Sequence, residues 1–513
     1  MNKKPPVTGW IIAVLAIVGL TQWLLRTGFA QTPGASSPSV SPSAATSPTP
    51  PPAESEHRMD ELFKLFETLD YATVGQVVKT SFTQDFVSAQ GENDLMSYLA
   101  DIVRRTGGIR RGKILPGGDG AIGFFQSTLT EQWGAIQISI EPTPPYRITS
   151  LFIQRAKAPK SATPEPASEK ARLAQISAFA TKLAKADLFS GVIAVAKNDK
   201  PIFTKAFGVA DRNFGIATTP DTRFALGGID KSLTAIAVAQ LVEAGKPSYE
   251  DPLSKFVDYP DKGSAGKIKI KHLLSHTSGL GDYNTDKYYA NVRRLNDVQS
   301  YFTILDHKPP GFEPGTNWQD SGIGYLMLGR VIEIAGGEDY YDYMQHHIFE
   351  PAGMQHSSDD FLLRVNPKSA VRYEDYFVKD HFVTTIYGYL SPPPVRGAPD
   401  SATVSTAEDV VRFVSALRNG KLVSSETYKL ITSPKPELGA KTYGYGFMMN
   451  FGNQEGRDVV GHSGDAPGIC TDYALVRDLK DPYTVVVLSN TSTMGHAVTE
   501  AILSLYKSAP TQN

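Results

Sequence analysis

The chain has 513 residues, of which 41% are hydrophobic and 10% aromatic, and this is enough for two or three domains with buried cores. Its 51 basic and 53 acidic residues leave a formal net charge of -2, which argues against a nucleic-acid partner held by a basic surface. The single cysteine, Cys470, excludes an internal disulfide and any cysteine-rich metal site.

The N-terminus has the pattern of an export signal. Positive charge in "MNKK" precedes the apolar run "WIIAVLAIVGLTQWLL", and "TGFAQ" then supplies small residues at Gly28 and Ala30. The run is somewhat shorter than the roughly 20 residues of a spanning helix. Residues 1–30 are therefore predicted to be either a cleaved signal peptide or an uncleaved membrane anchor. In both cases the remainder lies outside the cytoplasm, in the periplasm or cell envelope.

A linker and a small domain are expected next. Residues 31–56 are rich in proline, serine, alanine and threonine, so they predict a partly extended linker, either a spacer or a passive connection. Residues 57–156 show two amphipathic helices followed by three strand-like segments, which predicts a small α+β domain. Gly118, Gly120 and Gly123 match G-x-G-x-x-G, but a strand pattern follows them, so we interpret them as a hairpin turn.

A second linker, 157–170, precedes a large domain over 171–508. This domain opens with a helix and the hairpin "GVIAVAKNDKPIFTKAFGVAD", and it closes with two strand-like segments and a helix. The intervening part is mainly helical. The early and late strands can share one sheet only if the helical part is an insertion beside it. The predicted fold class is therefore α+β, with an antiparallel sheet flanked by helices plus a helical insertion.

Several motifs of the large domain occur in a recognisable order. They include "FALGGIDKSLTA", "IKIKHLLSHTSGLGDY", "FEPGTNWQDSGIGYLMLGRVIE" and "GHSGDAPG". Together they resemble the serine β-lactamase and penicillin-binding-protein superfamily, nearest the class C and esterase-like branch, and they imply its β-lactamase/transpeptidase-like fold. The small domain resembles NTF2-like or cystatin-like modules that sometimes precede such domains.

The first family motif, S-x-x-K, has lost its nucleophile in this chain. The corresponding segment runs from Gly228 to Lys231, so the lysine is present and the serine hydroxyl is not. Residues three apart share a helix face, which is why a lysine at this spacing can take a proton from the serine. Ser232 does not replace the hydroxyl, because it is turned about 100° away around the helix.

The second motif, Tyr-x-Asn in the family, corresponds here to Asp320, Ser321 and Gly322, so both of its functional side chains are changed. An aspartate facing Lys231 favours the ammonium form and raises the pKa of the lysine. A lysine that acts as a base needs the opposite shift. Lys231 and Asp320 are therefore predicted to form a structural ion pair.

The third motif is intact as His462, Ser463 and Gly464, the His-x-Gly form of the esterase-like branch. The resemblance implies that the backbone N–H groups of Asp465 and Gly228 are the oxyanion-hole donors. A carboxylate at position 465 could oppose negative charge there. Ser401 and Ala402 stand where family members often have two glycines.

Two functions follow from these residues. The first is an extracytoplasmic binding protein, catalytically degenerate, that keeps the cleft for a peptidoglycan-like, peptide or ester ligand. The second is an active hydrolase that uses Lys231, His462 and a non-standard nucleophile such as Ser321, or direct attack by water. We expect no metal or other cofactor, because His272 and His276 lack the glutamate of a zinc-protease helix.

Overall fold

The computed structural model describes residues 50–156, 168–259, 261–306, 308–387, 392–453 and 456–506. The chain divides into two compact units, Met1–Pro164 with Asp375–Thr384, and Glu165–Glu374 with Thr385–Asn513. The leader predicted over 1–30 lies outside the described residues, as do most of both linkers. Across the described segments, no helix combines the length and apolar character needed to cross a membrane.

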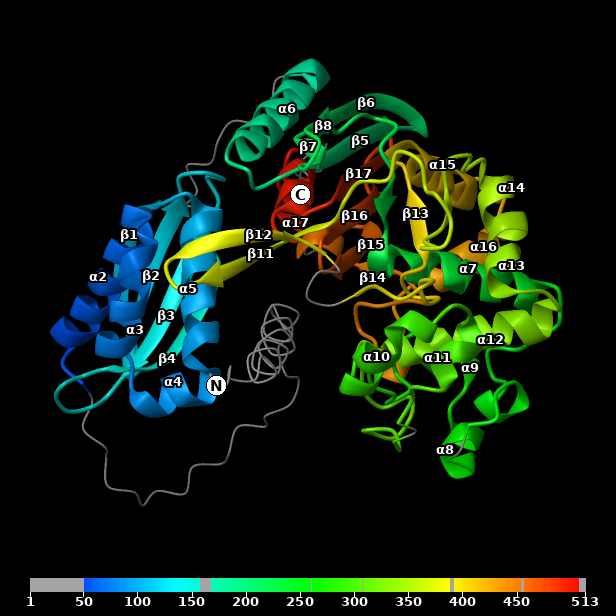
Figure 1. Cartoon of the computed structure of the whole chain (residues 1–513), viewed down its shortest axis with the longest axis horizontal. Coiled ribbons are helices and arrows are strands. Elements are labelled where there is room, and N and C mark those ends of the chain that lie inside the picture. The colour runs from blue at the N-terminus through cyan, green and yellow to red at the C-terminus, as the bar shows by residue number, and fades with distance from the viewer. Residues whose placement is uncertain are drawn as a thin grey trace, which may run out of the picture. The chain divides into compact units, whose positions relative to one another are not determined.

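The first unit is an antiparallel sheet in the order β1-β2-β3-β4 with helices packed against it (Figure 1). Gly123 of β2 lets helix α2 approach, because a Cβ there would lie only 2.6 Å from Met59 Sδ and 2.7 Å from Phe63 Cζ. The elements are α2 (Pro52–Thr68), α3 (Val74–Ser81), α4 (Gln84–Gln90), α5 (Glu92–Thr106), β1 (Ile109–Gly117), β2 (Gly120–Ser127), β3 (Trp133–Ile140) and β4 (Ile148–Arg155).

Two details of this unit bear on the sequence predictions. Gly117 pairs with Gly120, and Gly118 lies in the turn between them with φ of +59°, so the predicted hairpin turn is confirmed. Helix α2 begins at Pro52, inside the segment that we expected to be linker up to residue 56. Proline is well suited to the first helical turn, where its missing N–H has no partner to lose.

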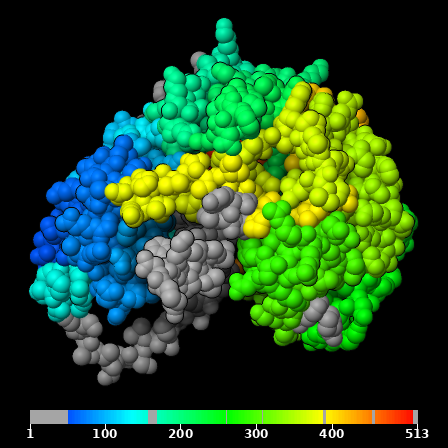
Figure 2. All heavy atoms as spheres, in the orientation of Figure 1, coloured from blue at the N-terminus to red at the C-terminus, as the bar shows by residue number. Residues whose placement is uncertain are grey.

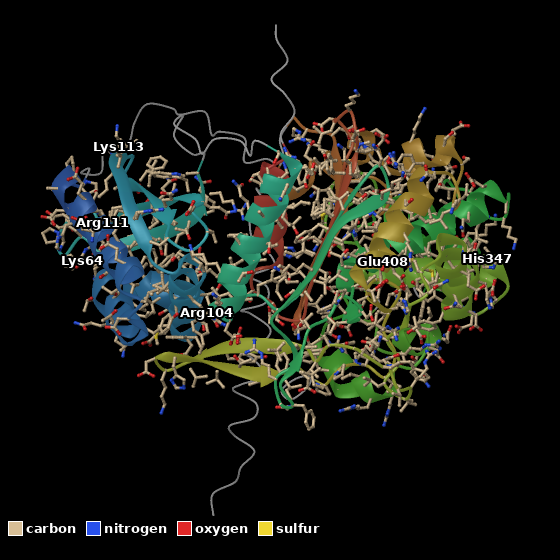
Figure 3. The ribbon with its side chains drawn as sticks, turned by 90° about the horizontal axis from the view of Figure 1, so that it is seen from above. Lys64, Arg104, Arg111, Lys113, His347 and Glu408 are labelled. Atoms are coloured by element: carbon tan, nitrogen blue, oxygen red, sulfur yellow. The ribbon has the colours of Figure 1, made fainter. Side chains whose placement is uncertain are left out.

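The first unit also includes a segment from far along the chain. Strands β11 (Tyr373–Val378) and β12 (His381–Ile386) form a hairpin whose Asp375–Thr384 portion belongs to this unit. The Arg104 guanidinium of α5 lies 4.7 Å from the Phe382 ring centroid and 2.9 Å from the Asp375 carboxylate. Figure 3 labels Arg104 beside this hairpin. The unit is therefore not continuous in sequence.

The second unit is built on a six-stranded antiparallel sheet in the order β14-β15-β16-β17-β5-β6. The hairpin of early strands joins the late strands where β5 pairs with β17, so the predicted shared sheet and the α+β fold class are confirmed. The strands are β5 (Gly191–Lys197), β6 (Lys200–Phe207), β14 (Met448–Met449), β15 (Val459–Ala466), β16 (Ile469–Val476) and β17 (Tyr483–Ser489).

Helices cover the sheet and continue into an insertion beside it (Figure 1). Helix α17 (Gly495–Ser504) packs on β16 and β17, and α15 (Ala407–Arg418) packs on β17 and β5. The other helices are α6 (Glu169–Lys185), α7 (Asp230–Glu243), α8 (Lys262–Lys267), α9 (Ile270–Leu274), α10 (Asp286–Asn291), α11 (Val298–Phe302), α12 (Gly322–Gly336), α13 (Tyr340–Met344), α14 (Glu350–Ala352) and α16 (Ser425–Ile431).

Helix α7 is buried on almost every side, as expected for the central helix of the unit. Its small residues Ala235, Ala237 and Ala239 are fully buried and allow close packing against α12. A short sheet leads into α7, with strand order β10-β13-β9. These strands are β9 (Phe224–Ala225), β10 (Ser358–Asp359) and β13 (Thr403–Ser405). Strand β9 thus delivers the chain directly to the start of the central helix.

The start of α17 is held to β16 by His496. Its Nδ1 lies 2.8 Å from Asp472 Oδ1, and its backbone N–H donates to Cys470 Sγ at 3.4 Å. Burial by itself lowers the pKa of His496, but the Asp472 carboxylate and Cys470 outweigh it and hold this pKa well above 6.5.

His496 is therefore expected to make stability depend on pH. Because its folded-state pKa is raised, its contribution is fully present below about pH 6.5 and is lost as pH rises through the folded value. His496→Gln should lower the free energy of unfolding more at pH 6 than at pH 9, as measured by urea unfolding. An equal loss at both pH values would show that the imidazolium charge contributes nothing.

Candidate functional site

Gly228 lies where the chain passes from β9 into α7, and strand β15 closes over it. A Cβ at this position would lie 2.6 Å from the Ser463 carbonyl oxygen and 3.6 Å from His462 Cε1. Contacts below about 3.0 Å with backbone atoms cannot be relieved by a side-chain rotation. The space that a nucleophilic side chain would need is therefore partly filled by β15.

Lys231 lies in the first turn of α7 and is paired with Asp320. Its Nζ donates to Asp320 Oδ1 at 2.9 Å and to Oδ2 at 3.1 Å. The lysine is 8% exposed, whereas the Asp320 side chain is 56% exposed, so the pair lies at the boundary between the core and solvent. The structure thus places together the two residues that the sequence predicted to form an ion pair.

The charges around Lys231 keep it protonated. Burial alone lowers its pKa, but the carboxylates of Asp320, Asp400 and Asp282 outweigh burial and raise it above 10.5. Burial acts to raise the pKa of Asp320, but Lys231 above all, together with His276, pulls it well below its ordinary value. At neutral pH the pair is an ammonium with a carboxylate, and a general base needs a free amine instead.

His276 completes this cluster. Its Nε2 lies 3.0 Å from Asp320 Oδ1, and its Nδ1 accepts from the Ser321 backbone N–H at 3.0 Å. In the neutral ring the proton therefore resides on Nε2, on the side of Asp320. Burial, with Lys231 nearby, lowers the pKa of His276 to about 3. In the sequence, only the Ser-His-Thr-Ser-Gly run points to His276.

Gly322, the first residue of α12, is enclosed by three side chains, which would have to move to admit a larger residue. A Cβ there would lie 2.9 Å from Asp282 Oδ1, 2.9 Å from Tyr283 Cε1 and 3.0 Å from Asp400 Oδ2. The Tyr283 hydroxyl donates to Asp400 Oδ1 at 2.7 Å. Two carboxylates thus occupy the space that the asparagine of the family motif would need.

Asp400 is a second titratable group of the site that sequence reasoning missed. Burial above all, together with the carboxylates of Asp282 and Asp320, raises its pKa to about 6, although Lys231 and the Tyr283 hydroxyl act in the opposite direction. Asp400 directly precedes Ser401 and Ala402, which stand where family members often have two glycines. This departure was the sequence signal that the loop at Asp400 differs from the family.

On β15, the ring of His462 is fully engaged within the protein. Its Nε2 is 2.8 Å from the Tyr443 hydroxyl, and its Nδ1 is 2.8 Å from the Ser463 carbonyl oxygen. Because a carbonyl only accepts, Nδ1 carries the proton and Nε2 accepts from Tyr443. Burial and the Lys231 charge lower the pKa of His462 to about 4. Tyr443, also missed from sequence, therefore donates its hydroxyl proton to His462.

The remaining predicted residues of β15 differ in their placement. A Cβ at Gly464 would lie 1.9 Å from the Leu226 carbonyl oxygen, so only glycine allows β15 to lie this close to the segment before Gly228. Asp465 Oδ2 lies 4.0 Å from His496 Nε2, on the side of α17. Its carboxylate therefore lies towards His496, and the role of its backbone N–H as an oxyanion-hole donor stays a prediction. Ser463 Oγ contacts Met448 Sδ at 3.9 Å.

The two serines nearest the motifs serve the fold. Ser321 is 1% exposed, donates to the Gly281 carbonyl at 2.8 Å and caps α12 by accepting from the Gly324 N–H at 3.0 Å. Ser232 is fully buried, and its hydroxyl is 2.6 Å from the Gly446 carbonyl oxygen and 2.7 Å from the Tyr473 hydroxyl. Neither hydroxyl is available to attack a substrate.

No metal-binding cluster of three or more His, Cys, Asp or Glu side chains is found among the described residues. His272 has a structural position, because its Nδ1 accepts from the Lys269 N–H at 3.2 Å where α9 begins.

Comparisons with known proteins agree with the motifs. The family model described as Beta-lactamase matches residues 176–506. PbpX of Bacillus subtilis (strain 168), which bears the name of a penicillin-binding protein, is 29% identical over 332 residues that cover 64% of this chain and 80% of PbpX. Teichoic acid D-alanine hydrolase of Staphylococcus aureus (strain MRSA252) is 29% identical over 271 residues, 51% of this chain and 63% of that protein.

The fold is also that of solved relatives. The crystal structure of a penicillin-binding protein from Bacillus halodurans aligns with a TM-score of 0.56 and 29% identity, over 65% of this chain and 98% of that one. The matched family residues span the six-stranded sheet, the central helix and the helical insertion. The chain therefore belongs to the serine β-lactamase and penicillin-binding-protein family.

Proposed function

We propose that this protein is a catalytically degenerate member of its family that binds an acyl-containing ligand of the cell envelope without turning it over. The observation that carries the proposal is the Lys231–Asp320 pair beside Gly228. The position of the nucleophile has no side chain, and the neighbouring lysine, the family's base, is held as an ammonium by a carboxylate 2.9 Å away.

The same geometry argues against hydrolysis by another group. Direct attack by water needs a base, but Lys231 is protonated and both ring nitrogens of His462 are engaged. His276 presents a protonated Nε2 to Asp320. Ser321, the alternative nucleophile considered from sequence, is a buried helix cap. Proton transfer is therefore unsupported at Lys231, His462, His276 and Ser321.

The ligand class follows from the names of the relatives. A penicillin-binding protein and a teichoic acid D-alanine hydrolase are among the proteins that this chain resembles. We infer a ligand that carries D-alanine, such as a peptidoglycan stem peptide or an ester-linked D-alanine. The backbone N–H groups of Gly228 and Asp465 are the proposed partners of its carbonyl oxygen. An envelope location accords with the export signal predicted over 1–30.

Calorimetry and product analysis with diacetyl-L-Lys-D-Ala-D-Ala test this proposal. We expect saturable binding of this peptide, weaker binding of its L-Ala-L-Ala stereoisomer, and no release of D-alanine over hours. Release of D-alanine would contradict the loss of turnover. Equal binding of the two stereoisomers, or binding of neither, would reject the ligand class.

A further inference from the structure

Two kinds of D-alanine ligand belong to the class proposed above, and they differ in charge. A stem peptide that ends in D-Ala-D-Ala carries a terminal carboxylate. D-Alanine held through an ester bond keeps a free ammonium beside its carbonyl group. The charged side chains around Lys231 distinguish between these two kinds.

The ammonium of Lys231 is already paired with a carboxylate. Its Nζ contacts both oxygens of Asp320, at 2.9 Å and 3.1 Å. His276 and His462 add no positive charge at neutral pH, because burial lowers the pKa of the first to about 3 and that of the second to about 4. These three positions therefore offer a ligand carboxylate no cation without a countercharge.

Two further carboxylates lie beside this pair. A Cβ at Gly322 would lie 2.9 Å from Asp282 Oδ1 and 3.0 Å from Asp400 Oδ2, so these two oxygens lie close together. They occupy the position of the asparagine of the family motif. Both carboxylates act, with Asp320, on the pKa of Lys231. Three carboxylates thus surround one ammonium.

These carboxylates are accessible from solvent. The Asp320 side chain is 56% exposed, Asp282 is exposed and Asp400 is half-buried. In Figure 2, the green surface of the helical insertion adjoins the yellow surface of the segment around residue 400. The Tyr283 hydroxyl, which donates to Asp400 Oδ1 at 2.7 Å, joins these two segments.

An exposed aromatic side chain lies at the same site. Trp318 is 37% exposed, and its ring centroid lies 5.9 Å from that of His276 and 6.1 Å from that of Tyr443. His276 in turn lies 3.0 Å from Asp320. Indole is the aromatic group that attracts cations most strongly. The indole and the carboxylates both favour an ammonium and disfavour an anion.

The close carboxylates also repel one another. Burial above all, together with Asp282 and Asp320, raises the pKa of Asp400 to about 6. A bound ammonium would relieve this repulsion, whereas a bound carboxylate would add to it. An ammonium has three N–H donors, which is enough to bridge the oxygens of Asp282 and Asp400.

We propose that the site selects D-alanyl esters, whose α-ammonium donates to Asp282 and Asp400 while the ester carbonyl accepts from the N–H groups of Gly228 and Asp465. This inference rests on the proposed function and names the ligand that the same site prefers. It concerns binding alone and includes no covalent step.

Calorimetric titration of the full chain at pH 6.5 tests the preference, with D-alanine methyl ester, N-acetyl-D-alanine methyl ester and N-acetyl-D-alanine as ligands. An α-amino group has an ordinary pKa of about 7.7–8.0, so the first ligand is a cation at this pH. It should bind on the order of tenfold more tightly than its acetylated form, which is neutral. N-Acetyl-D-alanine, an anion, should bind most weakly.

Variants separate charge from structure. Asp400→Asn and Asp282→Asn remove a charge but keep an acceptor oxygen for the hydroxyl and the N–H of Tyr283, respectively. Each should weaken binding of D-alanine methyl ester about tenfold and leave binding of the acetylated ester unchanged. A merely structural role would weaken both alike. Asp221→Asn, at a carboxylate that is 66% exposed and paired with Lys368, is the matched control and should bind as the wild type does.

Two results would overturn the proposal. One is D-alanine methyl ester that binds no more tightly than its acetylated form, and the other is a preference that neither aspartate variant reduces. If diacetyl-L-Lys-D-Ala-D-Ala still binds in either case, the proposed function stands and only the ammonium preference is rejected. If none of these ligands binds, the proposed ligand class is rejected as well.

Discussion

Gly228→Ser is expected to form no measurable acyl-enzyme, although it restores the hydroxyl of the family motif. In a serine hydrolase, loss of the nucleophile costs on the order of 10⁶ in turnover. Here the new Cβ would lie 2.6 Å from the Ser463 carbonyl oxygen, so the side chain has to displace β15. Lys231 also remains an ammonium paired with Asp320. We therefore expect Gly228→Ser to raise turnover by less than about a thousandfold, out of the roughly 10⁶-fold that loss of the nucleophile costs.

The same substitution should lower the stability of the fold. Overpacking of a well-packed region typically costs about 1–3 kcal/mol, and backbone atoms of β15 leave little room for relaxation. Turnover of a chromogenic cephalosporin and of p-nitrophenyl acetate, together with urea unfolding, measures both effects.

Gly228→Ala is the matched control, because it adds the same Cβ without the hydroxyl. Both variants should lose similar stability and show the same background turnover. Turnover by Gly228→Ser that exceeds Gly228→Ala by more than about a thousandfold would mean that Lys231 accepts a proton after all.

Lys231→Met is expected to lower the free energy of unfolding by about 3 kcal/mol at pH 7. Removal of one partner from a buried ion pair costs roughly 3–5 kcal/mol, and water around the half-exposed Asp320 carboxylate favours the lower end of that range. Methionine nearly conserves the volume, so the loss reports on charge. Guanidinium unfolding monitored by tryptophan fluorescence gives the measurement.

The free energy of unfolding that Lys231→Met loses relative to the wild type should decrease as pH falls below 7. The wild-type lysine has a raised pKa, so its contribution is present below about pH 10.5 and is lost above it. Wild-type Asp320 has a lowered pKa, so its contribution is present above about pH 3.8 and is lost as pH falls through the folded value. Without the lysine, Asp320 and Asp400 take up protons at a higher pH than in the wild type. The unpaired negative charge is then neutralised, so the stability difference between the variant and the wild type becomes smaller as pH falls from 7 towards 4.

The double variant Lys231→Met/Asp320→Asn serves as the control, because it removes both charges. It should regain much of the stability that the single variant loses. A double variant as unstable as the single one, or a deficit that is constant from pH 7 to pH 4, would show that the pair is not a significant electrostatic element.

Sequence reasoning located the site where the family motifs are continuous. Gly228, Lys231 and Asp320 follow from motif positions, and the Lys231–Asp320 contact follows from their opposite charges. Asp282 and Asp400 could not be found in this way. They come from two separate loops and meet at Gly322 only after the chain has folded.

The packing of β15 over Gly228 could not be predicted from sequence either. It depends on how closely the backbone of β15 approaches the segment before Gly228, which Gly464 permits because it has no Cβ.

In the fold, elements with a clear hydrophobic period were predictable, and those without one were not. Strand β1 was missed because its sequence "IRRGKILPG" places charged residues on an exposed surface and lacks alternation. The grouping of Asp375–Thr384 with the first unit involves contacts between distant parts of the chain, which local pattern does not encode. The resemblance of the first unit to NTF2-like or cystatin-like modules stays a prediction.

The central claim is that the site has kept the lysine of its first motif and the His-x-Gly strand but has lost its nucleophile. Incubation of the wild-type protein with a fluorescent penicillin and with a fluorophosphonate, followed by intact mass measurement and peptide mapping, tests it most directly. Our account predicts an unchanged mass with both reagents. A stable adduct mapped to a serine of the site, such as Ser321 or Ser463, would contradict it.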